Sequence, residues 1–197
     1  MASAETGCAG ALRLPAELCV TLRPITPDDA KVLQAYVRRL SPESRYNRFL
    51  GALQELPPAE LEHVTHLDRI YDLALLAEMK LGGASVVVGE ARHAFAPDRL
   101  ECEFALSVAD DWRRSGIGTL LMAEMERRAR SLGARRLVAE TLRSNDAMKA
   151  LAQKTGFSLA DMPADARLLR IVKDLTPSLG ALLPGHAHGG PDLPLAA

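Results

Sequence analysis

The sequence predicts an α/β fold in a single domain, built on one mixed sheet. Segments of alternating apolar and polar residues, typical of strands, are interspersed with segments whose apolar residues recur at helical spacing. This alternation favours helices on both faces of a sheet that has parallel as well as antiparallel strands. The chain has 197 residues, of which 48% are hydrophobic. That is enough for one domain with a sizeable core.

We expect the folded domain to occupy residues 17–175. Residues 1–16 are rich in small residues and lack periodicity, so we expect a flexible N-terminal arm. Residues 176–197 contain four prolines and four glycines without an amphipathic pattern, so we expect a disordered tail.

The first part of the domain is predicted to be a strand followed by helices. Residues 18–23 alternate and predict a strand. Residues 26–29, Thr-Pro-Asp-Asp, combine a capping side chain, an early proline and two acids, as at a helix start. A second helical region begins near Ser41, is broken by Pro57-Pro58, and resumes over residues 59–66.

Three strands are predicted next. Residues 72–79 and 84–95 flank Gly82-Gly83, which indicates a hairpin. Residues 100–108 alternate along their whole length. One face of this strand carries Cys102, Phe104, Leu106 and Val108, and the other carries Glu101, Glu103, Ala105 and Ser107.

The remaining elements alternate between helix and strand. A helix over residues 117–132, ended by Gly133, presents Leu121, Met125, Ala129 and Leu132 inward. We expect further elements in this order: a strand over 135–141, a helix over 145–155 ended by Gly156, and strands over 157–159 and 167–173.

The segment from Trp112 to Met122 points to a pyrophosphate. It joins the 100–108 strand to the next helix through a loop with two arginines and two glycines. Free N–H groups and the positive dipole end of a helix N-terminus attract phosphate, glycine allows close approach, and arginine adds a charged fork. The predicted cradle is Arg113, Arg114, Ser115, Gly116, Ile117, Gly118 and Thr119.

Two kinds of cofactor compete for this loop. A dinucleotide loop, G-x-G-x-x-G, matches Gly116 and Gly118, but its third glycine is Leu121 here, although Glu140 stands where a ribose-binding acid would. A P-loop is excluded because its pattern does not occur. The second kind of cofactor is coenzyme A.

The coenzyme A interpretation rests on two motifs. Residues 113–118 fit Gln/Arg-x-x-Gly-x-Gly/Ala, and Asn145-Asp146-Ala147-Met148 is followed by Gly156-Phe157. In this order and spacing they resemble the GNAT superfamily of N-acetyltransferases, over about residues 18–175. In addition, Ser41-Pro42-Glu43-Ser44-Arg45-Tyr46-Asn47-Arg48-Phe49 is similar to a segment of bacterial GNAT-type protein lysine acetyltransferases.

This resemblance implies an enzyme that transfers acetyl directly from acetyl-CoA to a primary amine, with protein lysine as the expected acceptor. The backbone of Leu106, Ser107 and Val108 is then expected to line the pantetheine arm, which can pair with a strand edge as a peptide does. Asn145 is expected to cap a helix, either alone or together with an amide contact to the cofactor arm.

Glu103 is the predicted general base. A free lysine has a pKa near 10.4, so deprotonating it at pH 7 costs about 4 to 5 kcal/mol, and a carboxylate that takes the proton offsets part of this. The resemblance adds that GNAT lysine acetyltransferases commonly place a glutamate on this strand in an Ala-Glu-Phe-Ala-like context, which Cys102-Glu103-Phe104-Ala105 matches apart from the cysteine. Glu101, on the same face, is the rival, and a solvated surface residue is the structural alternative.

One departure concerns the general acid. Many GNAT enzymes have a tyrosine four residues before the Gly-Phe glycine that protonates the leaving thiolate, and this chain has Ala152 there. The proton then comes from water or from another group. The absent tyrosine keeps open the alternative of an acyl-CoA-binding sensor without turnover. Separately, a small-molecule amine N-acetyltransferase is the alternative within the same class of enzyme.

Composition limits the partners and the compartment. The net charge of −1 gives no reason to expect nucleic acid or membrane binding. Cys8, Cys19 and Cys102 lack metal-like pairing and indicate reduced thiols, hence a cytoplasmic protein, with Cys102 buried and inert. The His-x-His at residues 186–188 has no third ligand, so we expect no metal. The sequence does not specify the oligomeric state.

Overall fold

The computed structural model describes residues 11–14, 19–67, 72–96 and 100–175. Its strands form one sheet in the order β1-β2-β3-β4-β5-β6-β8-β7. The strands are β1 (Ala11–Arg13), β2 (Cys19–Pro24), β3 (Leu73–Leu81), β4 (Ala84–Phe95), β5 (Glu101–Val108), β6 (Arg136–Leu142), β7 (Ser158–Asp161) and β8 (Leu168–Asp174). The helices are α1 (Ala30–Arg39), α2 (Pro42–Phe49), α3 (Pro58–Thr65), α4 (Ile117–Ser131) and α5 (Asp146–Lys154), with short 3-10 turns η2 (Pro27–Asp29) and η3 (Asp110–Trp112).

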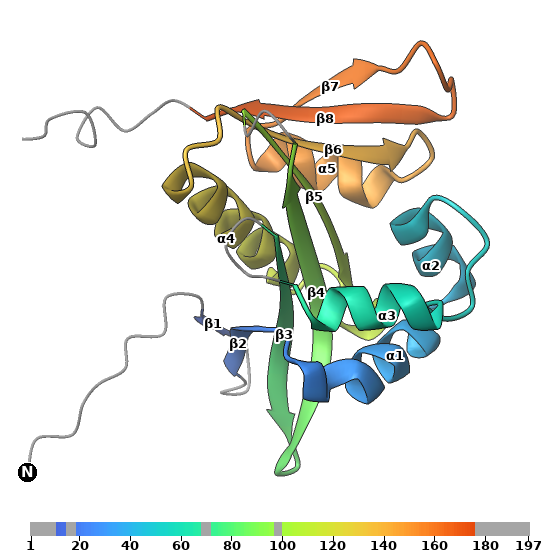
Figure 1. Ribbon diagram of the computed structural model, residues 1–197, viewed down its shortest axis with the longest axis vertical. Coiled ribbons are helices and arrows are strands. Elements are labelled where there is room, and N and C mark those ends of the chain that lie inside the picture. Colours follow the sequence, from blue (N-terminus) through green and yellow to red (C-terminus); the bar gives the residue numbers. More distant parts are fainter. Residues whose placement is uncertain (1–10, 15–18, 68–71, 97–99, 176–197) are drawn as a thin grey trace, which may run out of the picture.

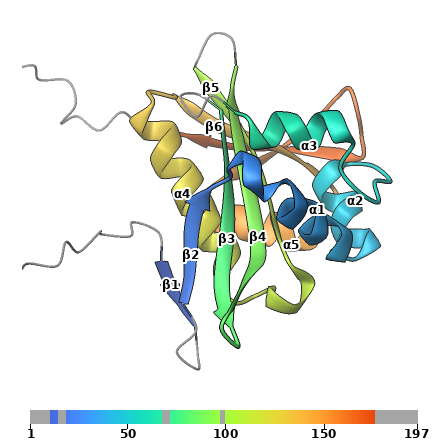
Figure 2. The same ribbon diagram turned by 60° about the horizontal axis from the view of Figure 1, so that its bottom comes forward.

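Helices cover the sheet on both faces, as predicted. The helices α1, α2 and α3 lie on one face, and α4 and α5 lie on the other (Figures 1 and 2). Each face has its own core because alternate residues of a strand point to opposite sides. On β3, Leu73, Leu75 and Ala77 join the core under α4, whereas Ala74 and Leu76 join the core under α1.

The described elements agree with the predicted ones to within a few residues, with two corrections. The expected flexible arm does not extend through residues 11–13, because these residues form β1 and pair with β2. Leu132 was expected inside but is 38% exposed, since it follows the last residue of α4. The predicted tail, residues 176–197, lies outside the described residues.

The approach of α4 to the sheet depends on Gly89, which lies beside a bulge in β4. The pairing of β3 with β4 shifts between Ala77 and Glu78, opposite Gly89. A Cβ atom on Gly89 would lie 3.2 Å from Leu121 Cδ1 of α4 and 3.1 Å from the Ser107 carbonyl oxygen of β5. Glycine at this bulge therefore lets the helix and two strands meet closely.

The most consequential feature of the sheet is a split between β5 and β6. These strands are parallel and pair only where residues 101–103 face residues 136–138. Beyond Glu103, β5 continues along β4 as far as Val108, while β6 continues along β8. The edge of β5 over residues 104–108 thus has no strand partner on the β6 side, and we call this segment the bare edge.

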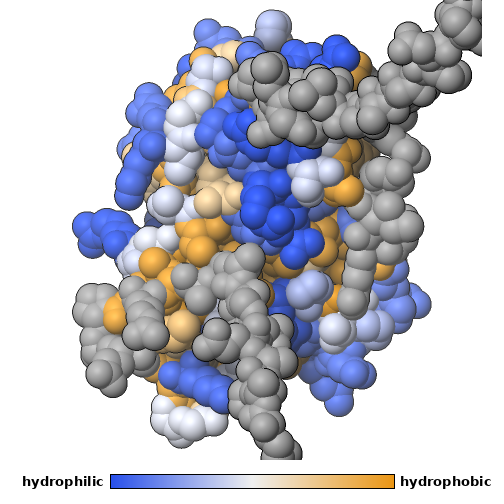
Figure 3. Space-filling model, turned by 90° about the vertical axis from the view of Figure 1, so that its left-hand side faces the viewer, coloured by the Kyte–Doolittle hydropathy of each residue, from blue (hydrophilic) through white to orange (hydrophobic). Residues whose placement is uncertain are grey.

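Charged residues of α4 pair with one another on its surface and make that part of the surface hydrophilic. Glu124 binds Arg127 and Arg128, and Glu126 binds Arg130. The side of the molecule seen in Figure 3 accordingly interleaves hydrophilic with hydrophobic residues. None of the helices in the described residues combines the length and the low polarity needed to cross a bilayer.

Candidate functional site

The predicted phosphate loop opens α4 with exposed backbone donors. Gly116 is the residue before the helix, with φ of 95°, and no described side chain caps this end. The first amide to bond back is that of Leu120, which donates to the Gly116 carbonyl at 3.0 Å. The amides of Ile117, Gly118 and Thr119 are therefore the unpaired N–H groups of a helix start. Such groups can donate hydrogen bonds to an anion that lies against the loop.

Backbone conformation and packing also favour glycine at the two glycine positions of the loop. Gly116 needs its positive φ, and a Cβ there would lie 3.3 Å from Leu12 Cδ2 of β1. A Cβ on Gly118 would lie 3.1 Å from Leu151 Cδ2 of α5. Gly118 thus allows α4 and α5 to pack closely. The sequence pattern predicted a different reason for this glycine, the close approach of a phosphate.

The two arginines of the loop differ in what they contact. The Arg113 guanidinium pairs with Asp110 at 3.1 Å and donates to the Ser44 hydroxyl of α2. Arg114 has φ of 61° and an exposed side chain. Ser115 donates to the Trp112 carbonyl at 2.6 Å. Arg113 is therefore paired within the protein, and an anion at the predicted cradle would be held mainly by backbone amides.

The bare edge of β5 connects this loop to the rest of the site. Leu106 and Val108 pack partly against the core under α4, while Ser107 is buried on the opposite face. Asn145 lies across the split, after the end of β6, and its Oδ1 accepts from the Met148 amide at 3.1 Å. The predicted helix cap at Asn145 is confirmed, and its contact to a cofactor stays a prediction.

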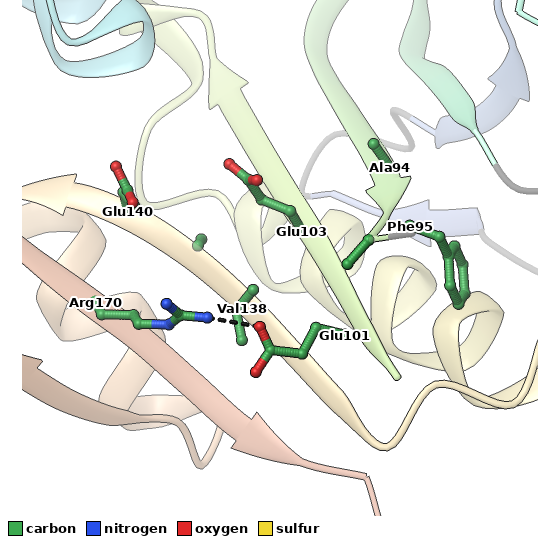
Figure 4. Close-up of a pocket in the computed structure, with 9 residues that line it drawn as sticks. Ala94, Phe95, Glu101, Glu103, Val138, Glu140 and Arg170 are labelled. Carbon is green, nitrogen blue, oxygen red and sulfur yellow. Dashed lines mark hydrogen bonds and ion pairs between the residues drawn. The ribbon is translucent and has the colours of Figure 1, made fainter. Parts of the chain in front are cut away.

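A cavity of about 360 Å³ opens where β5 and β6 separate (Figure 4). Its walls combine apolar residues with three carboxylates and one arginine. The lining consists of Ala94, Phe95, Ala96, Glu101, Glu103, Val138, Ala139, Glu140 and Arg170.

The structure distinguishes the two candidate bases on β5. Glu101 forms ion pairs with Arg136 at 2.9 Å and with Arg170 at 2.7 Å. A carboxylate held by two guanidinium groups is less available to a substrate amine, because such a contact would replace existing ion pairs. Among the residues that the structure describes, the salt bridges of this cavity all go to Glu101, and none goes to Glu103.

Glu103 also has the better position. It is the last β5 residue paired with β6, opposite Val138, so the bare edge begins at the next residue. Its side chain is exposed, and so is that of Glu140 on β6. Figure 4 shows the two carboxylates on the two diverging strands, with Arg170 turned instead to Glu101.

One cluster of charged residues was not identified from the sequence. Glu90 of β4 is only 1% exposed and pairs with Arg48 of α2 and with Arg92. Burial alone raises the pKa of Glu90, but the two arginine charges, together with hydrogen bonds from Arg48 and Ser107, outweigh it and lower the pKa to about 2. The charged residues within the apolar strand 84–95 were the available signal.

The position of the missing tyrosine is part of the core. Ala152 of α5 is fully buried. The described tyrosines are Tyr36 on α1 and Tyr46 on α2, and neither belongs to α5. Cys102 is buried, as predicted, and burial raises the pKa of its thiol to about 12. The described residues contain no group of three potential metal ligands, and the histidines at 186 and 188 lie outside them.

Comparisons with known proteins agree on one family. A sequence model of the Acetyltransferase (GNAT) family matches residues 43–157. The acetyltransferase PA5475 of Pseudomonas aeruginosa is 32% identical over 138 residues, or 70% of this chain and 74% of that protein. The acetyltransferase Pat of Mycolicibacterium smegmatis is 29% identical over 136 residues, or 68% of this chain and 40% of Pat. The crystal structure of the GNAT domain of S. lividans PAT matches with a TM-score of 0.74 and 28% identity, over 84% of this chain and 96% of that domain.

Proposed function

Because this chain belongs to the GNAT family of acetyltransferases, we propose that it transfers an acetyl group from acetyl-CoA to the side-chain amine of a protein lysine, with Glu103 as the base. The chain is an acyltransferase that uses acetyl-CoA as cosubstrate. The proposal adds the acceptor, the base and the path of the donor across β5.

The observation that carries the proposal is the unpaired carboxylate of Glu103 at the start of the split. The cosubstrate supplies an activated acetyl thioester. The uncapped amides of α4 fit its pyrophosphate, and the bare edge of β5 fits its pantetheine arm. A donor that follows this path would bring its thioester toward Glu103.

The residues of the cavity then have definite tasks. Glu103 accepts a proton from the lysine ammonium, directly or through water, so that nitrogen attacks as the neutral amine. Backbone N–H groups of the bare edge are available to the oxygen of the acetyl carbonyl as negative charge develops there. Ala152 offers no acid, so solvent protonates the leaving thiolate.

Support for a protein acceptor comes from a likeness in the sequence, because residues 41–49 are similar to a segment of protein lysine acetyltransferases. The cavity also suits a lysine, because its apolar walls accommodate a methylene chain and its two exposed carboxylates, Glu103 and Glu140, attract an ammonium. A small-molecule amine is the alternative acceptor.

We place the reaction in the cytoplasm. Cys19 and Cys102, the two cysteines that the structure describes, are both free thiols. Free thiols are typical of a reducing compartment.

The experiment compares Glu103→Gln with Glu101→Gln. Wild-type protein is incubated with labelled acetyl-CoA and a cell lysate, and both proteins and metabolites are analysed by mass spectrometry. Glu103→Gln is expected to lower kcat by about 100-fold or more, the usual contribution of a general base, while calorimetry shows unchanged CoA affinity.

Glu101→Gln is the matched control, because it neutralises a carboxylate on the same face of β5 that is already paired. Its kcat is expected to stay within about threefold of wild type. A larger loss in Glu101→Gln than in Glu103→Gln would transfer the role of base to Glu101. Label only in metabolites would favour a small-molecule acceptor, and no label with intact CoA binding would favour a sensor.

A further inference from the structure

The bare edge of β5 needs support from somewhere other than a second strand. Its Ser107 is buried on the face opposite α4. Ser107 Oγ donates to Glu90 Oε1 at 3.0 Å, and because a carboxylate only accepts, the Tyr36 hydroxyl must donate to Ser107 Oγ, also at 3.0 Å. Tyr36 and Glu90 are each 1% exposed. The Ser107 side chain is thus held between two buried polar groups.

Two arginines connect Glu90 to the helices through ion pairs. Arg48 of α2 donates through Nε to Glu90 Oε1 at 2.5 Å and through Nη2 to Glu90 Oε2 at 3.3 Å. Arg92 Nε donates to Glu90 Oε2 at 3.1 Å, and its Nη1 reaches Glu60 of α3 at 3.1 Å. All three helices of this face are therefore bonded to Ser107 through at most two intermediates.

A second cluster holds the chain three residues further on. Asp110 of η3 accepts from the Ser41 amide and the Ser41 hydroxyl, each at 2.9 Å, and from the Ser44 hydroxyl at 2.5 Å. Arg113 bonds to both Asp110 and Ser44. Burial raises the pKa of Asp110, but these hydrogen bonds and the Arg113 charge outweigh it, so the pKa is lowered and the carboxylate stays ionised.

We propose that α2 is a brace for the donor site, with Glu90 and Asp110 as the positioning residues through which it acts. The two clusters bind both ends of residues 107–113, the segment that joins the bare edge to the phosphate loop. The inference rests on the proposed path of acetyl-CoA along this segment. A segment already held in its binding conformation loses less freedom when a ligand binds, and buried charge pairs are costly to rearrange.

The brace gives a physical task to the polar residues of the segment 41–49. Ser41 and Ser44 bind Asp110, and Arg48 binds Glu90. Neither carboxylate belongs to the cavity that holds Glu103. The part of the sequence that resembles protein lysine acetyltransferases therefore acts, in this account, on the donor side of the reaction.

The test measures CoA binding by calorimetry and, separately, the kinetics of acetyl transfer. Glu90→Gln and Asp110→Asn are each expected to raise the Kd for CoA and the KM for acetyl-CoA about tenfold. At saturating acetyl-CoA their kcat is expected to stay within about threefold of wild type. Tyr36→Phe and Ser44→Ala, which remove one hydroxyl each, test the same two clusters with less risk to folding and are expected to shift Kd about threefold.

Asp29→Asn is the matched control. Asp29 is also a buried carboxylate, bound by Arg23 at 2.7 Å and by the Thr26 amide at 2.7 Å, but it contacts neither residues 107–113 nor α2. It is expected to lower Tm without changing Kd, which separates positioning from general stability.

The brace is overturned if the hydroxyl and carboxylate variants bind CoA with the wild-type Kd, or if kcat falls while Kd does not change. These outcomes leave the proposed function intact. Wild-type protein that binds CoA but transfers no acetyl group overturns the function and leaves the brace standing, so the two failures are distinguishable.

Discussion

The two ends of β5 are built differently although they belong to one strand of eight residues. At its first end, residues 102 and 103 are paired with both β4 and β6, and Glu101 pairs with β6 and is held by two arginines. At its second end, residues 104–108 have β4 on one side only, and side chains hold the strand in place. Glu103 stands at the boundary. A carboxylate held by two ion pairs and one with no ion pair to a described residue are therefore separated by one residue.

Gly116→Glu is expected to have the largest effect, because it blocks the phosphate loop beyond the bare end. It puts a side chain at φ of 95°, against Leu12, and a negative charge at the positive end of α4. We expect the Kd for CoA to rise more than about 100-fold, equal to about 2.8 kcal/mol, as measured by calorimetry.

Gly133→Glu is the control for this change. Gly133 follows the other end of α4 with φ of 86° and has open space around its Cβ position. Gly133→Glu introduces the same backbone strain as Gly116→Glu but lies away from the phosphate loop. Its CoA affinity should therefore remain at the wild-type value. Equal losses of affinity in both variants would remove the loop from the donor site.

Acid titration tests the network that holds the bare end. The pKa of Glu90 is about 2 in the folded protein, against about 4.3 in an unfolded chain. Because the folded pKa is the lower one, this stabilisation is complete above about pH 4.5 and is lost as pH falls toward 2. Its size is on the order of 3 kcal/mol.

Urea unfolding between pH 2.5 and 7 measures that loss. Glu90→Gln should be less stable than wild type at pH 7, and the difference should shrink as the pH falls. The pKa of Asp29 is also about 2, chiefly because of hydrogen bonds from Arg23. The wild-type protein and Glu90→Gln therefore both keep some acid sensitivity. A difference between Glu90→Gln and wild type that is constant with pH would contradict an ionised, paired Glu90.

Arg170→Ala addresses the paired end and is expected to have the smallest effect. It removes one of the two partners of Glu101, at a site where the arginine side chain is 41% exposed. An ion pair of this exposure contributes up to about 1 kcal/mol. We expect a Tm shift of a few degrees that diminishes in high salt, with kcat within about twofold of wild type. A tenfold fall in kcat would show that Glu101 and Arg170 take part in turnover.

The sequence predicted what depends on neighbouring residues. Alternation located β5 and its two faces, the loop motif located the start of α4, and the residue type identified the Asn145 cap. These features are set by local periodicity and local hydrogen bonding. The elements could therefore be predicted to within a few residues.

What could not be predicted depends on partners far apart in the chain. Glu101 and Arg136 are neighbours only because β5 and β6 pair in that register, and Arg170 comes from a third strand. The ion pairs that set Glu101 apart from Glu103 could therefore be seen only in the structure. The same holds for the split of the sheet and for the hydrogen bond from Arg113 to Ser44, 69 residues away.

A crystal structure of the protein with CoA tests the central claim most directly. We predict the pyrophosphate against the amides of residues 116–119, and the pantetheine arm along residues 106–108 with its thiol directed toward Glu103. CoA bound at any other surface, or with its thiol directed away from the split between β5 and β6, would contradict this account.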